Sequence, residues 1–185
     1  LLAVPKSVWV VIDEAYFEYL DHPQYGSALC LMERFENLII TRTFSKIYGL
    51  ASLRLGYGVT SSRFADLLNR ARQPFNVGGL TLAAGVAALS DDEFVIESRQ
   101  KNEKGLRQLE KGLDELGLPW IPSGGNFLAV DCDRDGQELF RELLKEGVIV
   151  RAIGEYGMPN HIRVSVGLPE ENIRFLHSLA KVLGA

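Results

Sequence analysis

The sequence predicts an α/β fold, because two runs rich in β-branched and other apolar residues alternate with segments of helical periodicity. The runs at 8–12 and 37–43 are typical of strands that are buried on both faces of a sheet. After residue 92 the pattern changes to a long charged helix and a tail of shorter elements. We therefore predict a large domain with a mostly parallel sheet over residues 1–92. A small α+β domain follows over residues 93–185.

The elements of the first domain follow from local signals. The first strand ends at Asp13-Glu14, and the second ends at Phe44-Ser45-Lys46. The segment 16–26 contains Pro and Gly and indicates a loop, and a short helix is expected at 29–35. A short strand at 57–60 leads into a helix that ends near Arg70, with Ser61 or Ser62 as its N-cap. An Ala-rich helix covers 81–89.

The second domain starts with a long helix that has acidic residues in its first turn, where they suit the helix dipole. This helix ends near Leu116, before Gly117 and Pro119, and its many charges predict one solvated face. Strands are predicted at 127–130, 148–150 and 161–166, and helices at 136–146 and 169–182. The alternation in the last strand predicts one buried and one exposed face.

Composition excludes several classes of function. With 46% hydrophobic and 24% charged residues, the chain is ordinary for a globular protein. The net charge of -4 and the lack of a basic tract give no reason to expect nucleic acid. We expect no membrane segment, because apolar runs fall short of about 20 residues, and we expect no signal peptide. Cys30 and Cys132 stand alone and the histidines are scattered, so we predict no metal site, two buried thiols and a cytoplasmic setting.

Two side chains stand just beyond the ends of the two buried strands, where open parallel sheets bind ligands. Asp13 could meet a cation there, or it could simply cap a turn. Lys46 could attack a carbonyl, since burial or a nearby cation favours the neutral form of a lysine amine. Its alternative is a solvated surface lysine, which is less favoured because Phe44, Ile47 and Gly49 are apolar or glycine.

Several further residues could bind anions. Arg54 could join Thr43 and Ser45 in clamping a phosphate, because a guanidinium fork matches phosphate geometry and hydroxyls add donors. We name these three residues the phosphate clamp; a surface ion pair is the alternative for Arg54. Arg163 lies in the last alternating strand and could either bind a carboxylate or occupy the exposed face. Arg151 follows an apolar strand in the same way.

Together these residues form motifs that resemble the fold-type-I pyridoxal-phosphate (PLP) aminotransferases, and within them the histidinol-phosphate aminotransferase subgroup. One departure is Ser52, where the family usually has a smaller residue, often Gly. The resemblance covers nearly the whole chain and is carried by the stretches 13–16, 43–46, 49–57, 72–77, 125–127, 147–151 and 161–167.

The resemblance implies a role for each candidate. Lys46 would hold PLP as a Schiff base and move the proton during the reaction. Asp13 would pair with the pyridine nitrogen, Tyr16 would bind the ring's phenolic oxygen, and the phosphate clamp would bind the cofactor phosphate. Arg163 would bind the substrate α-carboxylate, and Arg151 the phosphate end of the substrate.

The implied fold is the C-terminal part of the large PLP-binding domain followed by the small domain. The implied reaction transfers an amino group from histidinol phosphate to 2-oxoglutarate in histidine biosynthesis, in a homodimer. Because the family has a first half that this sequence lacks, we expect the 185 residues alone to be weakly active or inactive. Two alternatives stay open. One is another enzyme of the same fold, an aromatic aminotransferase or an amino-acid phosphate decarboxylase. The other is a non-catalytic module that binds a phosphate ligand or a partner.

Overall fold

The computed structural model describes residues 1–21 and 25–184. The chain divides into two compact units, unit 1 (Leu1–Arg99) and unit 2 (Gln100–Ala185), and each is described by itself. The division falls inside the long helix α3 (Asp92–Glu115), whereas the pattern of the sequence places the boundary at the first turn of this helix. The domain boundary at 92/93 therefore stays a prediction.

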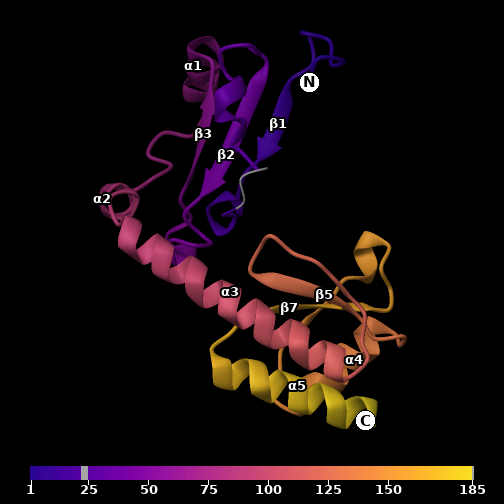
Figure 1. Ribbon diagram of the computed structural model, residues 1–185. Coiled ribbons are helices and arrows are strands. Elements are labelled where there is room, and N and C mark those ends of the chain that lie inside the picture. Colours follow the sequence, from indigo (N-terminus) through magenta and orange to yellow (C-terminus); the bar gives the residue numbers. More distant parts are fainter. Residues whose placement is uncertain (22–24, 185) are drawn as a thin grey trace. The chain divides into compact units, whose positions relative to one another are not determined.

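Unit 1 is built on a three-stranded sheet in the order β1–β2–β3 (Figure 1). β1 (Val10–Asp13) runs parallel to β2 (Leu38–Thr43), and β2 pairs antiparallel with β3 (Gly56–Thr60). The three predicted strands of the first domain are thereby found. The register pairs Asp13 with Thr41, so the carboxyl ends of β1 and β2 lie side by side.

The helices of unit 1 follow the predicted order. α1 (Ser62–Ala71) begins after Ser61, as expected, and α2 (Gly79–Leu89) is the Ala-rich helix. The helix expected at 29–35 is only a 3-10 turn, η2 (Ala28–Leu31), and another turn, η3 (Ala51–Leu53), precedes β3. The segment predicted as a loop at 16–26 contains η1 (Phe17–Tyr19), and its residues 22–24 lie outside the described residues.

One expectation about unit 1 is wrong: the first strand is not buried on both faces. Leu38 and Ile40 of β2 are fully buried, but Val11 of β1 is 59% exposed. β1 is an edge strand of the described sheet, and the described residues leave more than half of Val11 uncovered. Trp9, just before β1, packs its ring 4.0 Å from that of Phe64 on α1 and stays partly exposed.

Unit 2 contains a four-stranded antiparallel sheet in the order β4–β5–β7–β6. The predicted strand at 148–150 is wrong: Val148 and Val150 are buried in the core, but the ladder pairing to β7 begins only at Arg151. The elements are β4 (Trp120–Ile121), β5 (Phe127–Asp131), α4 (Gly136–Lys145), β6 (Arg151–Ala152), η4 (Gly154–Tyr156), β7 (His161–Ser165) and α5 (Pro169–Leu183).

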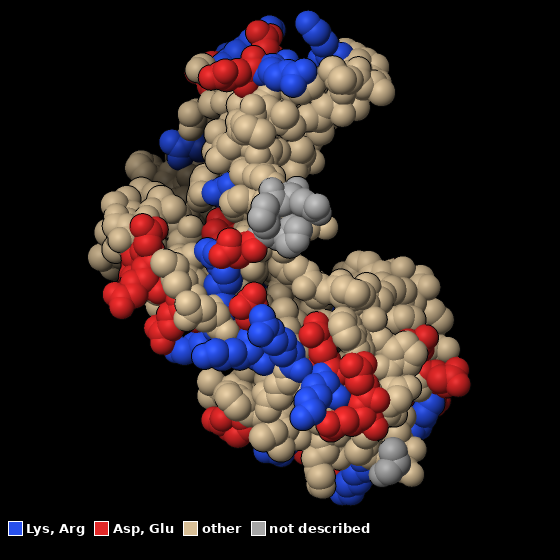
Figure 2. Space-filling model, viewed as in Figure 1, with Lys and Arg blue, Asp and Glu red and all other residues tan. Residues whose placement is uncertain are grey.

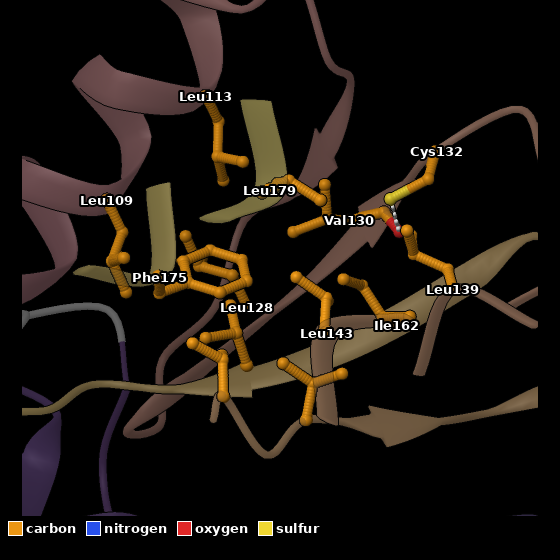
Figure 3. Packing of buried hydrophobic residues seen from close by; sticks show 13 residues of the cluster. Leu109, Leu113, Leu128, Val130, Cys132, Leu139, Leu143, Ile162, Phe175 and Leu179 are labelled. Carbon is orange, nitrogen blue, oxygen red and sulfur yellow. Dashed lines mark hydrogen bonds between the residues drawn. The ribbon is translucent and has the colours of Figure 1, made fainter. Parts of the chain in front are cut away.

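The core of unit 2 lies between one face of this sheet and its helices (Figure 3). The alternation predicted for the last strand is present, because Ile162 and Val164 of β7 point inward. The helices contribute apolar side chains at helical spacing, and the sheet contributes every second residue. The labelled core residues are Leu109, Leu113, Leu128, Val130, Cys132, Leu139, Leu143, Ile162, Phe175 and Leu179.

The two cysteines differ. Cys132 is buried in the core of unit 2, and burial raises the pKa of its thiol to about 12. Cys30 is exposed, contrary to expectation, because η2 lies at the surface of unit 1. The described cysteines are both free thiols.

The charged residues of α3 lie mainly on its exposed face, as the sequence predicted. Figure 2 shows a band of Lys, Arg, Asp and Glu side chains over this helix. Arg107 pairs with Glu103, and Lys111 pairs with Glu115, each one helical turn apart. In the part of the chain that the structure describes, no helix is long and apolar enough to cross a membrane.

Candidate active site

An open pocket of about 350 Å³ lies at the carboxyl ends of β1 and β2. It gathers five of the six candidates that the sequence places in unit 1, and the sixth, Tyr16, contacts one of them. The five candidates thus bring a carboxylate, an amine, two hydroxyls and a guanidinium to one surface, and Thr41 and Arg42 add a further hydroxyl and a further guanidinium residue to the lining. Its lining residues are Asp13, Ala15, Thr41, Arg42, Thr43, Ser45, Lys46 and Arg54.

Asp13 is the last residue of β1 and is exposed at the pocket. Its Oδ1 accepts a hydrogen bond from the backbone N–H of Ala15 at 3.0 Å and one from the Thr41 hydroxyl at 3.4 Å. The first contact is the turn cap that the sequence left open as an alternative. The cap and a ligand-binding role are compatible, because a carboxylate has about four lone-pair sites.

Lys46 follows the end of β2 and is half-buried. Its Nζ lies 5.1 Å from the centre of the Tyr16 ring. The neighbouring Phe44 and Ile47 are buried, so the backbone on both sides of the lysine is anchored in the core of unit 1. This anchoring holds the amine at the pocket, which a freely solvated lysine would not require.

The phosphate clamp is assembled around the loop between β2 and β3. The Thr43 hydroxyl accepts a hydrogen bond from the Ser45 N–H at 3.0 Å. Arg54 donates to the Ser45 hydroxyl at 3.4 Å and to the Ala51 carbonyl at 2.8 Å. Gly56, which pairs with Thr43, lets the strands meet closely, because an added Cβ would lie 2.8 Å from the Arg42 carbonyl oxygen.

The backbone at Arg54 is left-handed, with φ 53°. A non-glycine side chain in this region costs about 1 kcal/mol, and such strain concentrates at functional sites. Here it turns the guanidinium back toward Ser45. Left-handed backbone also occurs at Phe75 and Asp133 among the described residues, so the conformation is compatible with a role for Arg54 and does not by itself assign one.

The two remaining candidates belong to unit 2. Arg163 on β7 and Arg151 on β6 are direct partners in the sheet, so their side chains leave the same face. The Arg163 guanidinium lies 4.9 Å from the Phe127 ring centre. Arg151 is exposed, pairs with Glu155 and donates to the Tyr156 hydroxyl at 3.1 Å. Its hydrogen bond to Glu155 raises the pKa of Arg151.

Comparison with known proteins decides the family. The family model for aminotransferase class I and II matches residues 1–178. This chain belongs to the class I and II aminotransferase family. The chain is 56% identical over 180 residues to histidinol-phosphate aminotransferase 2 of Pseudomonas fluorescens, covering 97% of this chain and 49% of that protein. It is 55% identical over 183 residues to the protein of the same name from Pseudomonas aeruginosa, covering 99% and 50%.

A solved structure supports the same family assignment for this chain. The histidinol-phosphate aminotransferase of Sinorhizobium meliloti, in complex with pyridoxal-5'-phosphate, matches with a TM-score of 0.91 and 29% identity. The match covers 99% of this chain and 50% of that structure. The α/β fold predicted from the sequence is thereby confirmed. The chain spans about half the length of the curated relatives it matches.

Two charged residues of this chain, Glu14 and Arg42, were missed by the reasoning from sequence. Glu14 is 8% and Arg42 13% exposed, and their side chains form an ion pair at 2.7 Å. Arg42 also lines the pocket and lies 4.6 Å from the Phe17 ring centre. The available signal was Arg42 itself, a cation inside an apolar strand run, together with an acid directly after Asp13.

The electrostatics of this pair depend on a second acid, Glu18. Burial by itself raises the pKa of Glu14, but hydrogen bonds from Ala28, Arg42 and Ser27 outweigh it, and the pKa lies below the usual 4.5. Burial raises the pKa of Glu18 above its usual value, and the Arg42 charge offsets this only in part. Arg42 lies 3.8 Å from Glu18. Glu14 is therefore the ionised partner of Arg42. Arg42 stabilises the ionised form of Glu18 less than that of Glu14.

Proposed function

We propose that this chain forms the covalent cofactor site of a PLP-dependent aminotransferase. The proposed enzyme transfers the amino group of histidinol phosphate to 2-oxoglutarate in histidine biosynthesis. The observation that carries the proposal is the pocket that joins Asp13, Lys46 and the phosphate clamp in unit 1. The names of the similar proteins support the substrate. Because the chain spans half the length of those relatives, the activity is proposed for a protein of their length that contains it.

The residues of the pocket fit PLP by the chemistry of their donors and acceptors. PLP offers an aldehyde, a pyridine nitrogen, a phenolic oxygen and a phosphate. The pocket offers an amine for the aldehyde in Lys46 and a carboxylate for a protonated pyridine in Asp13. The phosphate clamp offers one guanidinium and two hydroxyls for the phosphate. Tyr16, whose ring lies beside the lysine amine, offers a phenol for the ring oxygen.

When bound, PLP withdraws electrons from the substrate carbon that loses its proton. The chain's own residues then have separable tasks. Asp13 would keep a positive charge on the pyridine nitrogen, which would strengthen this withdrawal. The Lys46 amine would accept the proton from the substrate Cα and deliver it to the neighbouring carbon of the cofactor. The clamp prevents the cofactor from moving while the proton is transferred.

The substrate groups are assigned to unit 2. We propose that Arg163 binds the α-carboxylate of the amino-acid substrate, since a guanidinium binds a carboxylate through two parallel hydrogen bonds. We propose that Arg151 binds the phosphate end of histidinol phosphate. Because Arg151 pairs with Glu155, substrate phosphate would have to compete with this carboxylate.

We further propose that the functional protein is a cytoplasmic homodimer. The exposed apolar side chains Leu80 and Val86 of α2 support association, because apolar surface of this kind marks protein interfaces. Sedimentation of a protein of the relatives' length that contains this chain, at several protein concentrations, tests the homodimer. A monomer at every concentration would contradict it.

The decisive experiment traps the cofactor. A chimera is made in which this chain replaces the 180 residues that it matches in the Pseudomonas fluorescens relative. The chimera is incubated with PLP, reduced with borohydride and digested, and the labelled peptide is identified by mass spectrometry. We expect visible absorbance before reduction and a pyridoxyl label on Lys46. A colourless protein, or a label on another lysine, would overturn the proposal.

The substrate is tested on the same chimera. Turnover is measured with histidinol phosphate, phenylalanine and threonine phosphate, each with 2-oxoglutarate. We expect the highest kcat/KM for histidinol phosphate. A preference for phenylalanine, or loss of carbon dioxide from threonine phosphate, would replace this substrate by one of the other reactions of the fold. Trapped cofactor without any turnover would leave a binding module.

A further inference from the structure

A buried ionic network lies directly beside the proposed cofactor pocket. Glu14 Oε1 accepts hydrogen bonds from the Ala28 N–H at 2.6 Å and the Ser27 hydroxyl at 3.0 Å. Its Oε2 accepts from two nitrogens of Arg42, Nε at 3.0 Å and NH2 at 2.7 Å. Arg42 also donates to the Ser27 hydroxyl at 2.9 Å. Three separate segments of unit 1 therefore meet at one carboxylate.

Stability alone is a poor explanation for this network. Removing two charges from water is costly, and apolar side chains of similar size are often as good or better in such a place. Buried ion pairs can instead select one arrangement of the chain over others. The network of Glu14, Ser27 and Arg42 meets this description, since each partner contacts the other two.

The network is tied to the pocket through the backbone. Glu14 follows Asp13, and its N–H donates to the Thr41 carbonyl at 2.9 Å. Arg42 stands between Thr41, whose hydroxyl donates to Asp13, and Thr43 of the phosphate clamp. Adjacent strand residues point to opposite faces. The ion pair therefore lies on one face of the ends of β1 and β2 and joins them there. Asp13 and Thr41 lie on the opposite face of the same two strand ends.

We propose that Glu14 is a positioning residue for the cofactor site. Through Arg42 and Ser27 it holds the carboxyl ends of β1 and β2 together, so that Asp13 stays in place relative to Lys46 and the clamp. This inference rests on the proposed function, because it assigns Glu14 a role toward PLP. Glu14 itself makes no contact with the cofactor in this assignment.

The test separates positioning from stability. The double variant Glu14→Met with Arg42→Met, made in the chimera, replaces the ion pair by apolar chains of similar length. Because Arg42 also offsets the charge of buried Glu18, we expect the melting temperature to fall modestly, and PLP is titrated at a temperature at which the variant is folded. The dissociation constant of PLP, from absorbance titration, is expected to rise about tenfold, as for the loss of an ordered charged contact. The control is the double variant Arg134→Met with Glu142→Met, which removes an ion pair of 3.1 Å in unit 2. It should leave the affinity for PLP unchanged.

A second variant covers a failure of the double variant to fold. Ser27→Ala keeps both charges and removes only a hydroxyl that contacts each of them. We expect a smaller rise in the dissociation constant, about threefold. A value equal to that of the unsubstituted chimera, in either folded variant, would overturn the inference while the cofactor is still trapped on Lys46. If the unsubstituted chimera traps no cofactor on Lys46, the proposed function fails as well.

Discussion

The two units differ in how completely they bury their apolar side chains. In unit 2, helices α3, α4 and α5 and one sheet face enclose a core whose central leucines are fully buried (Figure 3). In unit 1, β2 is buried, but large apolar side chains stay exposed on β1 and α2. The proposed cofactor pocket nevertheless lies in unit 1. The residues proposed to hold the cofactor and the larger apolar core thus belong to different parts of the chain.

This difference indicates how the site is held. Catalytic side chains are best supported by rigid elements and by the residues behind them. In unit 1 the apolar core is small, and the ends of β1 and β2 are joined by the Glu14–Arg42 network. Exposed apolar surface of the kind seen on α2 marks contacts with further protein. The comparison predicts that substitutions in unit 1 change function more than stability, and that those in the core of unit 2 do the reverse.

The largest effect is expected for Lys46→Ala in the chimera. The substitution removes the amine that we propose binds the cofactor and moves the proton, so kcat should fall at least about 10³-fold. Borohydride should no longer label this segment. Lys46 is half-buried, so the melting temperature should stay nearly constant. Lys181→Ala, which breaks a surface pair with Glu146 at 2.7 Å, is the control and should retain activity. Full activity of the Lys46 variant would move the chemistry out of unit 1.

The next effect concerns the core of unit 2. Leu143 is fully buried, whereas its neighbour Leu144 on α4 is 47% exposed. Leu143→Ala should lower the free energy of unfolding by about 3 kcal/mol, because it leaves a cavity. Leu144→Ala should cost less than about 1 kcal/mol. Urea unfolding of the 185-residue chain, followed by Trp120 emission in a Trp9→Phe background, measures both. Equal costs would contradict the arrangement of α4 on the core.

A third prediction separates binding from strain at Arg54. Asn tolerates the left-handed region better than other non-glycine residues. Arg54→Asn should therefore leave the free energy of unfolding unchanged or slightly raised. It should weaken PLP binding by about 10- to 100-fold, because a charged donor is lost. The control is Asp133→Asn at another left-handed position, φ 49°, in unit 2. Unchanged PLP affinity in the Arg54 variant would remove this residue from the phosphate clamp.

The sequence predicted the fold well wherever local signals were strong. β2, α3, α4 and α5 lie within a few residues of their predicted positions, because apolar periodicity and caps define them. The strand expected at 148–150 was misplaced, since burial of Val148 and Val150 follows from packing while strand pairing depends on a partner. The exposure of Val11 also depends on tertiary contacts, which a run of β-branched residues does not reveal.

The candidate site, like the fold, could be predicted from the sequence in part. Asp13 and Lys46 were found because strand ends can be recognised from the sequence, and the structure brings them to one pocket. Their roles stay predictions until the cofactor is trapped. The Glu14–Arg42 pair was missed because its partners are distant in sequence, and a pairing between two strands requires their register. In the sequence, such a buried ion pair is indicated only by a charged residue within a strand that is otherwise apolar.

The smallest predicted effect tests the charge balance beneath the pocket. Glu18 is buried near Glu14 and Arg42, and its charge contributes to the raised pKa of Tyr19 and of Tyr48. Its Oε1 has no hydrogen-bond partner among the described residues. Its pKa is raised, so the folded state holds the proton more tightly than the unfolded state. The contribution of Glu18 to the stability of the native chain is therefore lost as pH rises from about 4.5 through the raised pKa.

Gln at position 18 does not titrate and avoids the cost of a buried charge. Glu18→Gln should thus stabilise the 185-residue chain by about 0.5–1 kcal/mol at neutral pH, and this gain should disappear below about pH 4.5. Glu14→Gln should show the opposite sign, because the lowered pKa of Glu14 means that its ionised form stabilises the fold until pH falls through that pKa. Urea unfolding at several pH values, followed by Trp9 emission in a Trp120→Phe background, measures both variants. If the free energy of unfolding of both variants changed with pH in the same direction, Arg42 would be shared equally between the two acids. Glu14 would then not be the preferred partner of Arg42 beside the pocket.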